Sequence, residues 1–365
     1  MNAINIDDFK DAARDILSED AWNYIAGGSE DEITIRDNAL AFSRWRLMPR
    51  ILRDISKRSP VVSLLGQEVA LPVVLAPTSP LRLAHVDAEL AAVNAAARSH
   101  VLAICSMDSH YSLEDTARAD GPLWFQLYCY GDRGHMAEII KRAEHAGYKA
   151  LVVTVDAFHP GRRERMLRRL FSMPANVGMG NLNGLELDST ARRPDGSIKR
   201  FALTWADLEW LASCTSLPII LKGILSPDDA DLAVARGAAA VVVSNHGGRQ
   251  IDQVPASLDC LAPVVERVGS RAEVYYDGGV RRGTDVLKAM ALGASAVLIG
   301  RAYIWGLAVA GEEGVSRVID IFRQEIDVAM AQLGLADLKS IDASFIVPST
   351  TYPGDQAPRL HSMVR

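Results

Sequence analysis

The stretch Ala-Ala-Ala-Val-Val-Val-Ser-Asn-His-Gly-Gly-Arg-Gln at residues 238–250 decides the fold. Its apolar half is typical of a strand buried on both faces of a parallel sheet. The strand ends at His246, which can move a proton near neutral pH, and at Arg249, whose guanidinium matches a carboxylate. Two glycines between them let the backbone approach a ligand closely. Taken alone, the motif is equally compatible with a loop that carries a capping histidine and a surface arginine.

Seven further apolar runs are spaced along the chain at about the length of one βα unit, with amphipathic stretches between them. This alternation predicts a (β/α)8 barrel of the TIM type. The competing architecture is a doubly wound open sheet, although no Gly-x-Gly-x-x-Gly follows the first strand. The expected strands are residues 72–76, 101–106, 123–128, 150–156, 218–223, 240–245, 273–278 and 296–300, and the clearest helices between them are 87–98, 133–146, 227–236 and 283–292.

One interval between strands is far longer than the others. Its excess, residues 157–203, predicts an insertion after the fourth strand on the catalytic face, either a lid or a disordered surface loop. Residues 1–66 form an N-terminal extension that starts as helix, and residues 313–333 continue as helix after the barrel. We therefore expect one domain over residues 1–365, with the barrel at about 67–311.

Composition narrows the function classes. A formal net charge of -6 on 365 residues argues against a general nucleic-acid binder. No apolar run is long enough for a membrane span, and no signal peptide is visible. The four cysteines lack metal-ligand spacing, so we expect reduced thiols in a cytoplasmic protein and no metal site; they are Cys105, Cys129, Cys214 and Cys260.

The last two strands end in glycines and arginines. In (β/α)8 barrels the loops after strands 7 and 8 often hold a phosphate, through backbone N–H groups and charged side chains. Here these would be Gly278, Gly279 and Arg281 after the seventh strand, and Gly300 and Arg301 after the eighth. Turn glycines and solubilising arginines are the alternative for either loop taken separately.

Lys222 emerges from an apolar strand, where a lysine is costly to bury unless it meets an anion or an electron-rich ring. It could form a Schiff base, as in barrel aldolases, or act as a partner for a cofactor. The phosphate loops, His246 and Arg249 favour a phosphorylated cofactor with an acid substrate above it.

At this point the chain resembles the FMN-dependent 2-hydroxy-acid oxidase/dehydrogenase family, which includes glycolate oxidase, lactate oxidase and mandelate dehydrogenase. The matching motifs run in the family's order from residue 24 to residue 301 and are together highly specific. They are Tyr24-x-Ala-Gly-Gly, Ala76-Pro77-Thr78, Phe125-Gln126-Leu127-Tyr128, Thr154-Val155-Asp156, Gly161-Arg162-Arg163, Leu203-Thr204-Trp205, Leu221-Lys222-Gly223, residues 244–250, residues 277–283 and Ile299-Gly300-Arg301.

The resemblance implies that FMN is the cofactor. Lys222 would stabilise the negative charge of the reduced flavin. The implied flavin-ring contacts are Pro77, Thr78, Ser79, Ser106, Gln126, Thr154, Lys222 and Ser244, and the implied ribityl and phosphate contacts are Asp277, Gly278, Gly279, Arg281, Gly300 and Arg301.

The resemblance also implies the catalytic roles. His246 would be the base, Asp156 would stabilise its protonated form, and Tyr128 would bond the hydroxyl being oxidised. Arg249 and Tyr24 would bind the substrate carboxylate, with Arg163 from the insertion as a second contact. The expected activity is oxidation of an (S)-2-hydroxy acid to the 2-oxo acid, with oxygen as acceptor and hydrogen peroxide as product. The expected assembly is a homo-oligomer, as the family is often tetrameric.

Alternatives to this activity stay open. The nearest is a dehydrogenase that passes electrons to a quinone or a carrier protein. A flavin barrel that isomerises a phosphorylated metabolite is less favoured, because His246, Arg249 and the two tyrosines suit a carboxylate. A degenerate barrel that only binds a ligand is disfavoured by the intact base and lysine.

The chain departs from the family pattern at several positions near the substrate. Ser79 stands where the family usually has a small Ala or Gly, and Pro160 is displaced by two positions in the insertion. Asp108 lies about where glycolate oxidase has an aromatic residue. It either caps the following helix, as Asp often does, or points into the substrate side-chain pocket and favours a hydroxyl or amine there.

Overall fold

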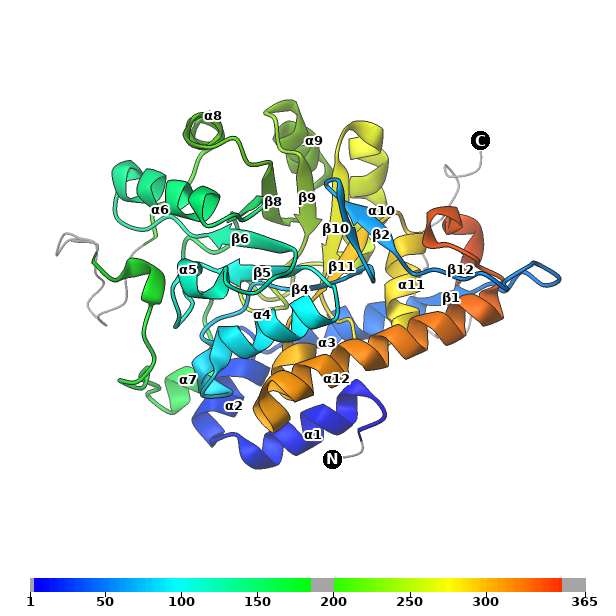
Figure 1. The fold of residues 1–365 in the computed structure, drawn as a ribbon, viewed down its shortest axis with the longest axis horizontal. Helices are drawn as coiled ribbons and strands as arrows, with labels where there is room; N and C mark the ends of the chain where they lie inside the picture. The colour runs from blue at the N-terminus through cyan, green and yellow to red at the C-terminus, as the bar shows by residue number, and fades with distance from the viewer. Residues whose placement is uncertain (1–2, 185–199, 350–365) are drawn as a thin grey trace.

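The computed structural model describes residues 3–184 and 200–349. Its centre is a closed barrel of eight parallel strands. Figure 1 shows helices around these strands. The strands follow chain order, and the barrel closes where Val297 pairs with Val73. This confirms the predicted (β/α)8 barrel. The strands are β4 (Val73–Leu75), β5 (Ala103–Ser106), β6 (Leu123–Leu127), β7 (Leu151–Thr154), β8 (Ile219–Ile224), β9 (Ala240–Val243), β10 (Glu273–Asp277) and β11 (Ala296–Ile299).

The barrel interior is a packed core. Every residue of β7, β9 and β11 is buried, because these strands are covered by helices outside and by side chains inside. Trp124 and Tyr275 come from strands that are not neighbours, yet their ring centroids lie 5.5 Å apart. The two rings therefore meet inside the barrel and fill it.

Helices surround the barrel where the amphipathic stretches predicted them. The expected helix at 227–236 is α9 (Pro227–Ala235), which is capped at its start: Ser226 Oγ accepts a hydrogen bond from Asp229 N at 3.4 Å, and Pro227 occupies the first turn. These helices are α4 (Ala88–Arg98), α5 (Leu113–Thr116), α6 (Arg133–His145), α8 (Trp205–Cys214), α9 (Pro227–Ala235), α10 (Ser257–Val268), α11 (Gly283–Ala291) and α12 (Arg301–Leu333).

The predicted helix at 313–333 is the second half of α12. Ala310 and Gly311 have non-helical backbone angles, so α12 consists of two helices that meet at a kink. Gly311 has a φ of 56°, which a residue without a side chain adopts at no steric cost.

The N-terminal extension is helical, as expected, and packs on the outside of the barrel. It contains α1 (Ile6–Ile16), α2 (Glu19–Ala26) and α3 (Ile33–Leu40). Helix α1 lies along α12, and α2 carries Tyr24 to the mouth of the barrel (Figure 1).

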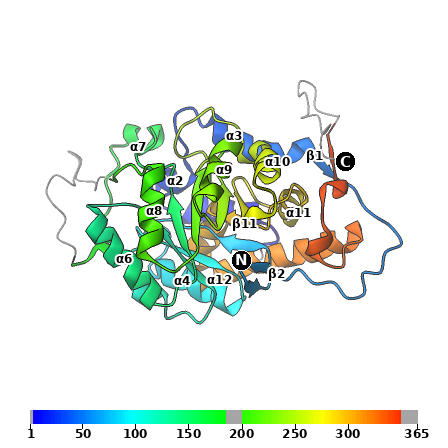
Figure 2. The ribbon, with the colours of Figure 1, turned by 90° about the horizontal axis from the view of Figure 1, so that it is seen from above.

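Two small antiparallel sheets were not predicted. One pairs β1 (Trp45–Leu47) with β12 (Ile346–Pro348), so that two distant segments lie side by side in Figure 2. The other is the hairpin of β2 (Val62–Leu64) and β3 (Gln67–Val69). Short 3-10 turns are η1 (Ala41–Arg44), η2 (Leu81–Leu83), η3 (Gly180–Leu182), η5 (Gly269–Arg271), η6 (Leu338–Ser340) and η7 (Ala343–Phe345).

The insertion after β7 begins at the carboxyl end of the barrel. Its short helix α7 (Glu164–Arg168) packs beside α2, as the two views show. Residues 185–199 of the predicted lid lie outside the described residues. Nowhere in residues 3–184 and 200–349 is there a helix long and apolar enough to cross a membrane.

Candidate active site

A cleft opens at the carboxyl ends of the strands, where barrel enzymes place their chemistry. It is open to solvent on one side. It brings together most of the residues predicted from sequence. These are Tyr24, Pro77, Thr78, Ser79, Ser106, Asp108, Tyr128, Arg163, Lys222, His246, Arg249, Asp277, Gly278, Gly279, Arg281, Gly300 and Arg301.

Four predicted residues do not line the cleft but support residues that do. Asp156 bonds His246, Ser244 bonds Lys222, and Gln126 accepts a hydrogen bond from Ser106 Oγ at 3.0 Å. Thr154 pairs with Lys222 in the barrel register. These four therefore lie one step behind the surface of the cleft.

His246 and Asp156 form the polar centre of the cleft. His246 Nδ1 lies 2.9 Å from Asp156 Oδ1, and the two side chains are only 18% and 15% exposed. Burial would raise the pKa of Asp156, but His246 and Lys222 outweigh it and lower that pKa. Burial also lowers the pKa of His246, against the opposing effect of Asp156. The imidazole is thus neutral at pH 7, donates from Nδ1 to the carboxylate, and has Nε2 free to accept a proton.

Lys222 is buried beside an acid. Its ammonium lies 3.2 Å from Asp277 Oδ2 and donates to Ser244 Oγ at 3.1 Å. Burial alone would lower the pKa of Lys222, yet Asp277 and Asp156 raise it. The ion pair with Asp277 therefore favours the protonated lysine, a form that suits a partner for a cofactor better than the Schiff-base alternative.

The predicted phosphate loops form a cationic end of the cleft. Arg301 donates to Ile25 O, Gly247 O and Gly27 O, each at 2.9 Å, and makes no ion pair within the described part of the chain. Burial and the nearby Arg249 and Arg281 lower the pKa of Arg301 well below its usual value. Buried guanidinium groups without a carboxylate partner need an anion.

Gly279 shapes the same end of the cleft. Its φ of 77° lies in the left-handed region, and a Cβ there would overlap the carbonyl of Asn38. Glycine lets the two backbones approach one another while the loop turns into the cleft.

A second cationic group surrounds Tyr24. The Cζ atoms of Arg249 and Arg163 lie 5.1 Å and 5.8 Å from the centre of the Tyr24 ring. Arg249 donates to Tyr24 O at 2.7 Å, and burial together with Arg163 lowers the pKa of Arg249 to about 10. Arg163 Nε is buried and has no hydrogen-bond partner among the described residues. Two guanidinium groups that lack an acid partner suit a substrate carboxylate.

Tyr128 lies beside Arg200, which the sequence analysis did not select. Arg200 Cζ is 3.4 Å from the centre of the Tyr128 ring. Burial raises the pKa of Tyr128 to about 12, so the phenol stays protonated and can donate a hydrogen bond. Within the described residues the Tyr128 hydroxyl forms no hydrogen bond of its own.

The wall between the two cationic ends is polar. Thr78 Oγ1 bonds the hydroxyl of Tyr303, and Ser79 Oγ donates to Asp108 O. Gln126 Nε2 is buried without a hydrogen-bond partner among residues 3–184 and 200–349. A buried amide that still has donors to use indicates a polar ligand at this wall.

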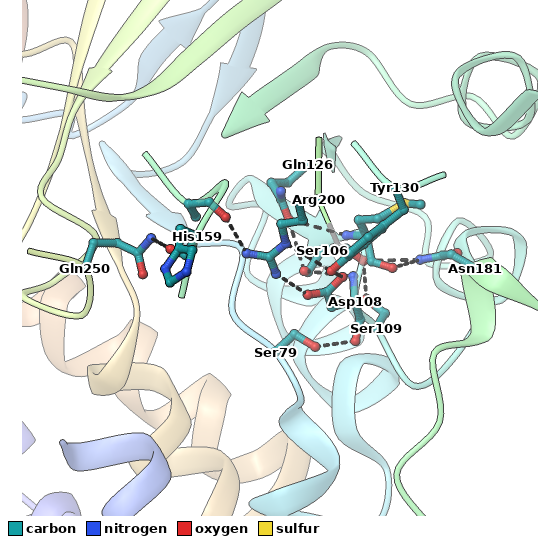
Figure 3. A network of polar contacts seen from close by, with 12 residues as sticks. Ser79, Ser106, Asp108, Ser109, Gln126, Tyr130, His159, Asn181, Arg200 and Gln250 are labelled. Carbon is teal, nitrogen blue, oxygen red and sulfur yellow. Dashed lines mark hydrogen bonds and ion pairs between the residues drawn. The ribbon is translucent and has the colours of Figure 1, made fainter. Parts of the chain in front are cut away.

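Asp108 does not cap the following helix, so that alternative was wrong. Ser112 caps α5 instead, and its Oγ accepts from Asp115 N at 3.1 Å. Asp108 lines the cleft, as the other alternative expected, but its carboxylate is paired with Arg200 (Figure 3).

Sequence reasoning missed three further residues of the site. Arg200 carries no local signal, since it is one of several basic residues in a mostly polar segment, residues 191–200. Gln250 donates to Asp156 O at 2.7 Å and was visible only as the last residue of a motif. Tyr130 donates to Asp108 Oδ1 at 2.7 Å and follows Tyr128 by two positions, a spacing that places both on one face of an extended chain.

Comparisons with known proteins agree with this site. The family described as FMN-dependent dehydrogenase matches residues 13–348. An L-lactate oxidase of Nostoc sp. is 46% identical over 356 residues, which cover 94% of this chain and 98% of that protein. The 2-hydroxyacid oxidase 1 of Homo sapiens is 42% identical, over 94% of this chain and 96% of its own. A crystal structure of mandelate oxidase with benzoyl-formic acid superposes with a TM-score of 0.89 at 37% identity, over 95% of this chain and 99% of that one. The chain belongs to the FMN-dependent dehydrogenase family.

Proposed function

We propose that this enzyme oxidises an (S)-2-hydroxy acid to the 2-oxo acid and passes the electrons to oxygen, with hydrogen peroxide as product. The observation that carries the proposal is the His246–Asp156 pair at 2.9 Å, in a cleft that also presents Arg249 and Arg163, neither of which has an acid partner among residues 3–184 and 200–349. A base and a carboxylate site in one cleft are what a 2-hydroxy acid requires.

FMN fits the remaining chemistry of the cleft. Arg281 and Arg301, with the backbone of Gly278, Gly279 and Gly300, would hold the phosphate. Lys222, Ser244 and Asp277 would meet the ribityl chain and the ring, and Gln126 offers an unused amide N–H. Further ring contacts would come from Pro77, Thr78, Ser79, Ser106 and Thr154. When bound, FMN supplies a two-electron acceptor for the α-carbon.

The protein's own residues would then bind the substrate and move its proton. Arg249, Arg163 and the Tyr24 side chain would hold the carboxylate and fix the α-carbon. The Tyr128 hydroxyl would donate to the oxygen being oxidised. His246 would accept the hydroxyl proton at Nε2, and Asp156 is the positioning residue that stabilises the resulting imidazolium through Nδ1.

Two relatives that carry the name oxidase support oxygen as the acceptor. The alternative is a quinone or a carrier protein. Anaerobic mixing of the yellow protein with a panel of 2-hydroxy acids should bleach the flavin, and admission of air should restore the colour within one turnover time and release peroxide. A flavin that stays reduced in air until a quinone is added would identify the protein as a dehydrogenase.

The expected assembly is a homotetramer in the cytoplasm. The free cysteines support a reducing compartment such as the cytoplasm. The apolar side chains of Ile51 and Leu52 support an interface between chains, since they are 81% and 100% exposed in the single chain. Light scattering during size-exclusion chromatography should give four chains per particle. A mass of one chain across the concentration range would rule the tetramer out.

A further inference from the structure

Asp108 and Arg200 form an ion pair on the wall of the cleft. Arg200 Nη2 lies 2.8 Å from Asp108 Oδ2, and the two side chains are 22% and 19% exposed. Both residues line the same cleft as His246 and Arg249. Both members of the pair therefore lie at the surface of the cleft that holds His246 and Arg249.

Three loops hold Arg200 in one orientation. Its Nε donates to the Tyr130 hydroxyl at 3.1 Å, and its Nη1 donates to Ala157 O at 2.9 Å. Its guanidinium also lies over the Tyr128 ring. Figure 3 shows Arg200 between Asp108 and Tyr130, from the loops after β5 and β6, on one side and His159, near the start of the insertion, on the other.

The pair is charged on both sides and neutral as a whole. Burial alone would lower the pKa of Arg200, but Asp108 and the two tyrosines raise it, so the guanidinium keeps its proton. Asp108 accepts hydrogen bonds from Arg200 and from the Tyr130 hydroxyl. A guanidinium has five N–H groups and a carboxylate has about four acceptor sites. Arg200 therefore keeps unused N–H donors, and Asp108 keeps unused acceptor sites.

These remaining groups determine which substrate tail fits. An apolar tail would remove water from both charged groups and replace none of the lost hydrogen bonds. A substrate tail with a second carboxylate would be repelled by the negative charge of Asp108. A tail with an ammonium group would be repelled by the positive charge of Arg200. A hydroxyl can donate to Asp108 and accept from Arg200 at once.

We propose that the Asp108–Arg200 pair is the specificity determinant of this enzyme, and that it selects 2-hydroxy acids whose side chain carries a hydroxyl group. This inference rests on the proposed oxidation of 2-hydroxy acids and names their class. It also corrects the expectation of an amine-bearing tail, because Arg200 balances the charge of Asp108.

The test compares substrates of equal size that differ only in the tail hydroxyl. One pair is 2,3-dihydroxypropanoate and 2-hydroxybutanoate, and the other is 2,4-dihydroxybutanoate and 2-hydroxypentanoate. All four acids have the S configuration at the carbon that is oxidised. Flavin reduction is followed anaerobically by stopped flow. In at least one pair the hydroxylated acid should reduce the flavin with an efficiency about tenfold higher or more, as expected for a hydrogen bond to a charged group.

Two variants separate the charges from the shape of the pocket. The double variant Asp108→Leu with Arg200→Met keeps similar volume without charge, and it should abolish or reverse the hydroxyl preference. Asp108→Asn leaves Arg200 without its counter-charge, and it should raise the relative efficiency of 2-hydroxysuccinate about tenfold or more. The matched control is Asp228→Asn, which breaks an exposed Arg267–Asp228 pair and should leave the ranking unchanged.

The outcomes distinguish the two proposals. Reduction of the wild-type flavin by 2-hydroxy acids without a hydroxyl preference, or a preference that survives in the folded double variant, refutes the specificity role alone. A wild-type flavin that no 2-hydroxy acid reduces refutes the proposed function itself. The visible spectrum of bound FMN reports whether the double variant has folded, and the single Asp108→Asn substitution tests the pair independently of it.

Discussion

The Lys222 ammonium lies 3.2 Å from the Asp277 carboxylate at the carboxyl ends of two barrel strands, β8 and β10, that β9 separates. Ser244 of the loop after β9 closes the gap, because its hydroxyl accepts from Lys222 and donates to Asp277 at 2.7 Å. Three successive strand ends thus share one buried charge network, which fixes the ammonium in the cleft before any ligand arrives.

Replacing Lys222 by Met should destabilise the protein as well as inactivate it. The substitution leaves Asp277 buried without its cation, and breaking a buried pair costs about 3–5 kcal/mol. Urea unfolding of the FMN-free protein measures the change. Lys149→Met, on the exposed surface, is the control and should stay within about 0.5 kcal/mol of the wild type. Equal losses for the two variants would contradict the network.

Removing the His246 imidazole should slow the chemical step and spare the cofactor. We expect His246→Ala to lower the rate of anaerobic flavin reduction about 100- to 10,000-fold, the usual contribution of a general base. The visible spectrum should still show one FMN per chain. Near-normal reduction by the best substrate would mean that another group accepts the proton.

The pH profile of flavin reduction should have its acid limb below 6.5. Burial lowers the pKa of His246, so the imidazole is able to accept a proton above that pKa, and activity is lost as the pH falls through it. Asp156→Asn removes the group that raises this pKa, so the acid limb should move to still lower pH while the maximal rate falls. A limb that does not move on this substitution would separate Asp156 from the base.

Arg249→Lys should weaken both substrate binding and the rate of reduction. A lysine keeps the charge but not the planar fork, so one charge-assisted hydrogen bond is lost. Such a bond contributes about 1.5–3 kcal/mol, which corresponds to a roughly 10- to 100-fold lower kcat/KM. Arg118→Lys, whose native side chain is 80% exposed, should leave the kinetics unchanged. Unaltered kinetics of Arg249→Lys on every acid tested would exclude the carboxylate role.

Removal of FMN should lower the midpoint of thermal unfolding, because the neighbouring charges of Arg281 and Arg301 then lack an anion. Adding FMN at about 100 times its Kd should restore about 2.7 kcal/mol. Riboflavin, which lacks the phosphate, should restore much less. Equal protection by riboflavin and FMN would show that the arginines do not bind the phosphate.

The barrel could be predicted because its strands are short apolar runs that end in glycine, proline or polar residues. Once eight such runs alternate with helices, topology places the residues at their carboxyl ends in one cleft. That is why His246, Lys222 and Arg301 could be grouped without a structure. Asp156 and Ser244 could be predicted for the same reason, since both lie at strand ends. In the structure they lie behind the cleft surface and form hydrogen bonds with His246 and Lys222.

The features that the sequence did not predict depend on contacts between segments that are far apart in the chain or on the path of long loops. Strands β1 and β12 have three residues each and pair across almost the whole chain, so no local pattern reveals them. Arg200 is placed by the path of the insertion, which a sequence of polar residues does not specify. The capping alternative for Asp108 failed because Ser112 lies nearer the helix start and offers the same kind of acceptor.

Arg301, at the start of the last barrel helix, has two of its three carbonyl partners, Ile25 O and Gly27 O, in a segment made near the beginning of synthesis. The anion site therefore cannot be completed until the first and last parts of the barrel domain have met. FMN binding therefore depends on residues at both ends of this domain. A chain truncated so that it lacks residues 25–27 could still close its eight strands, but Arg301 would lose two of the carbonyl partners that orient it toward the phosphate.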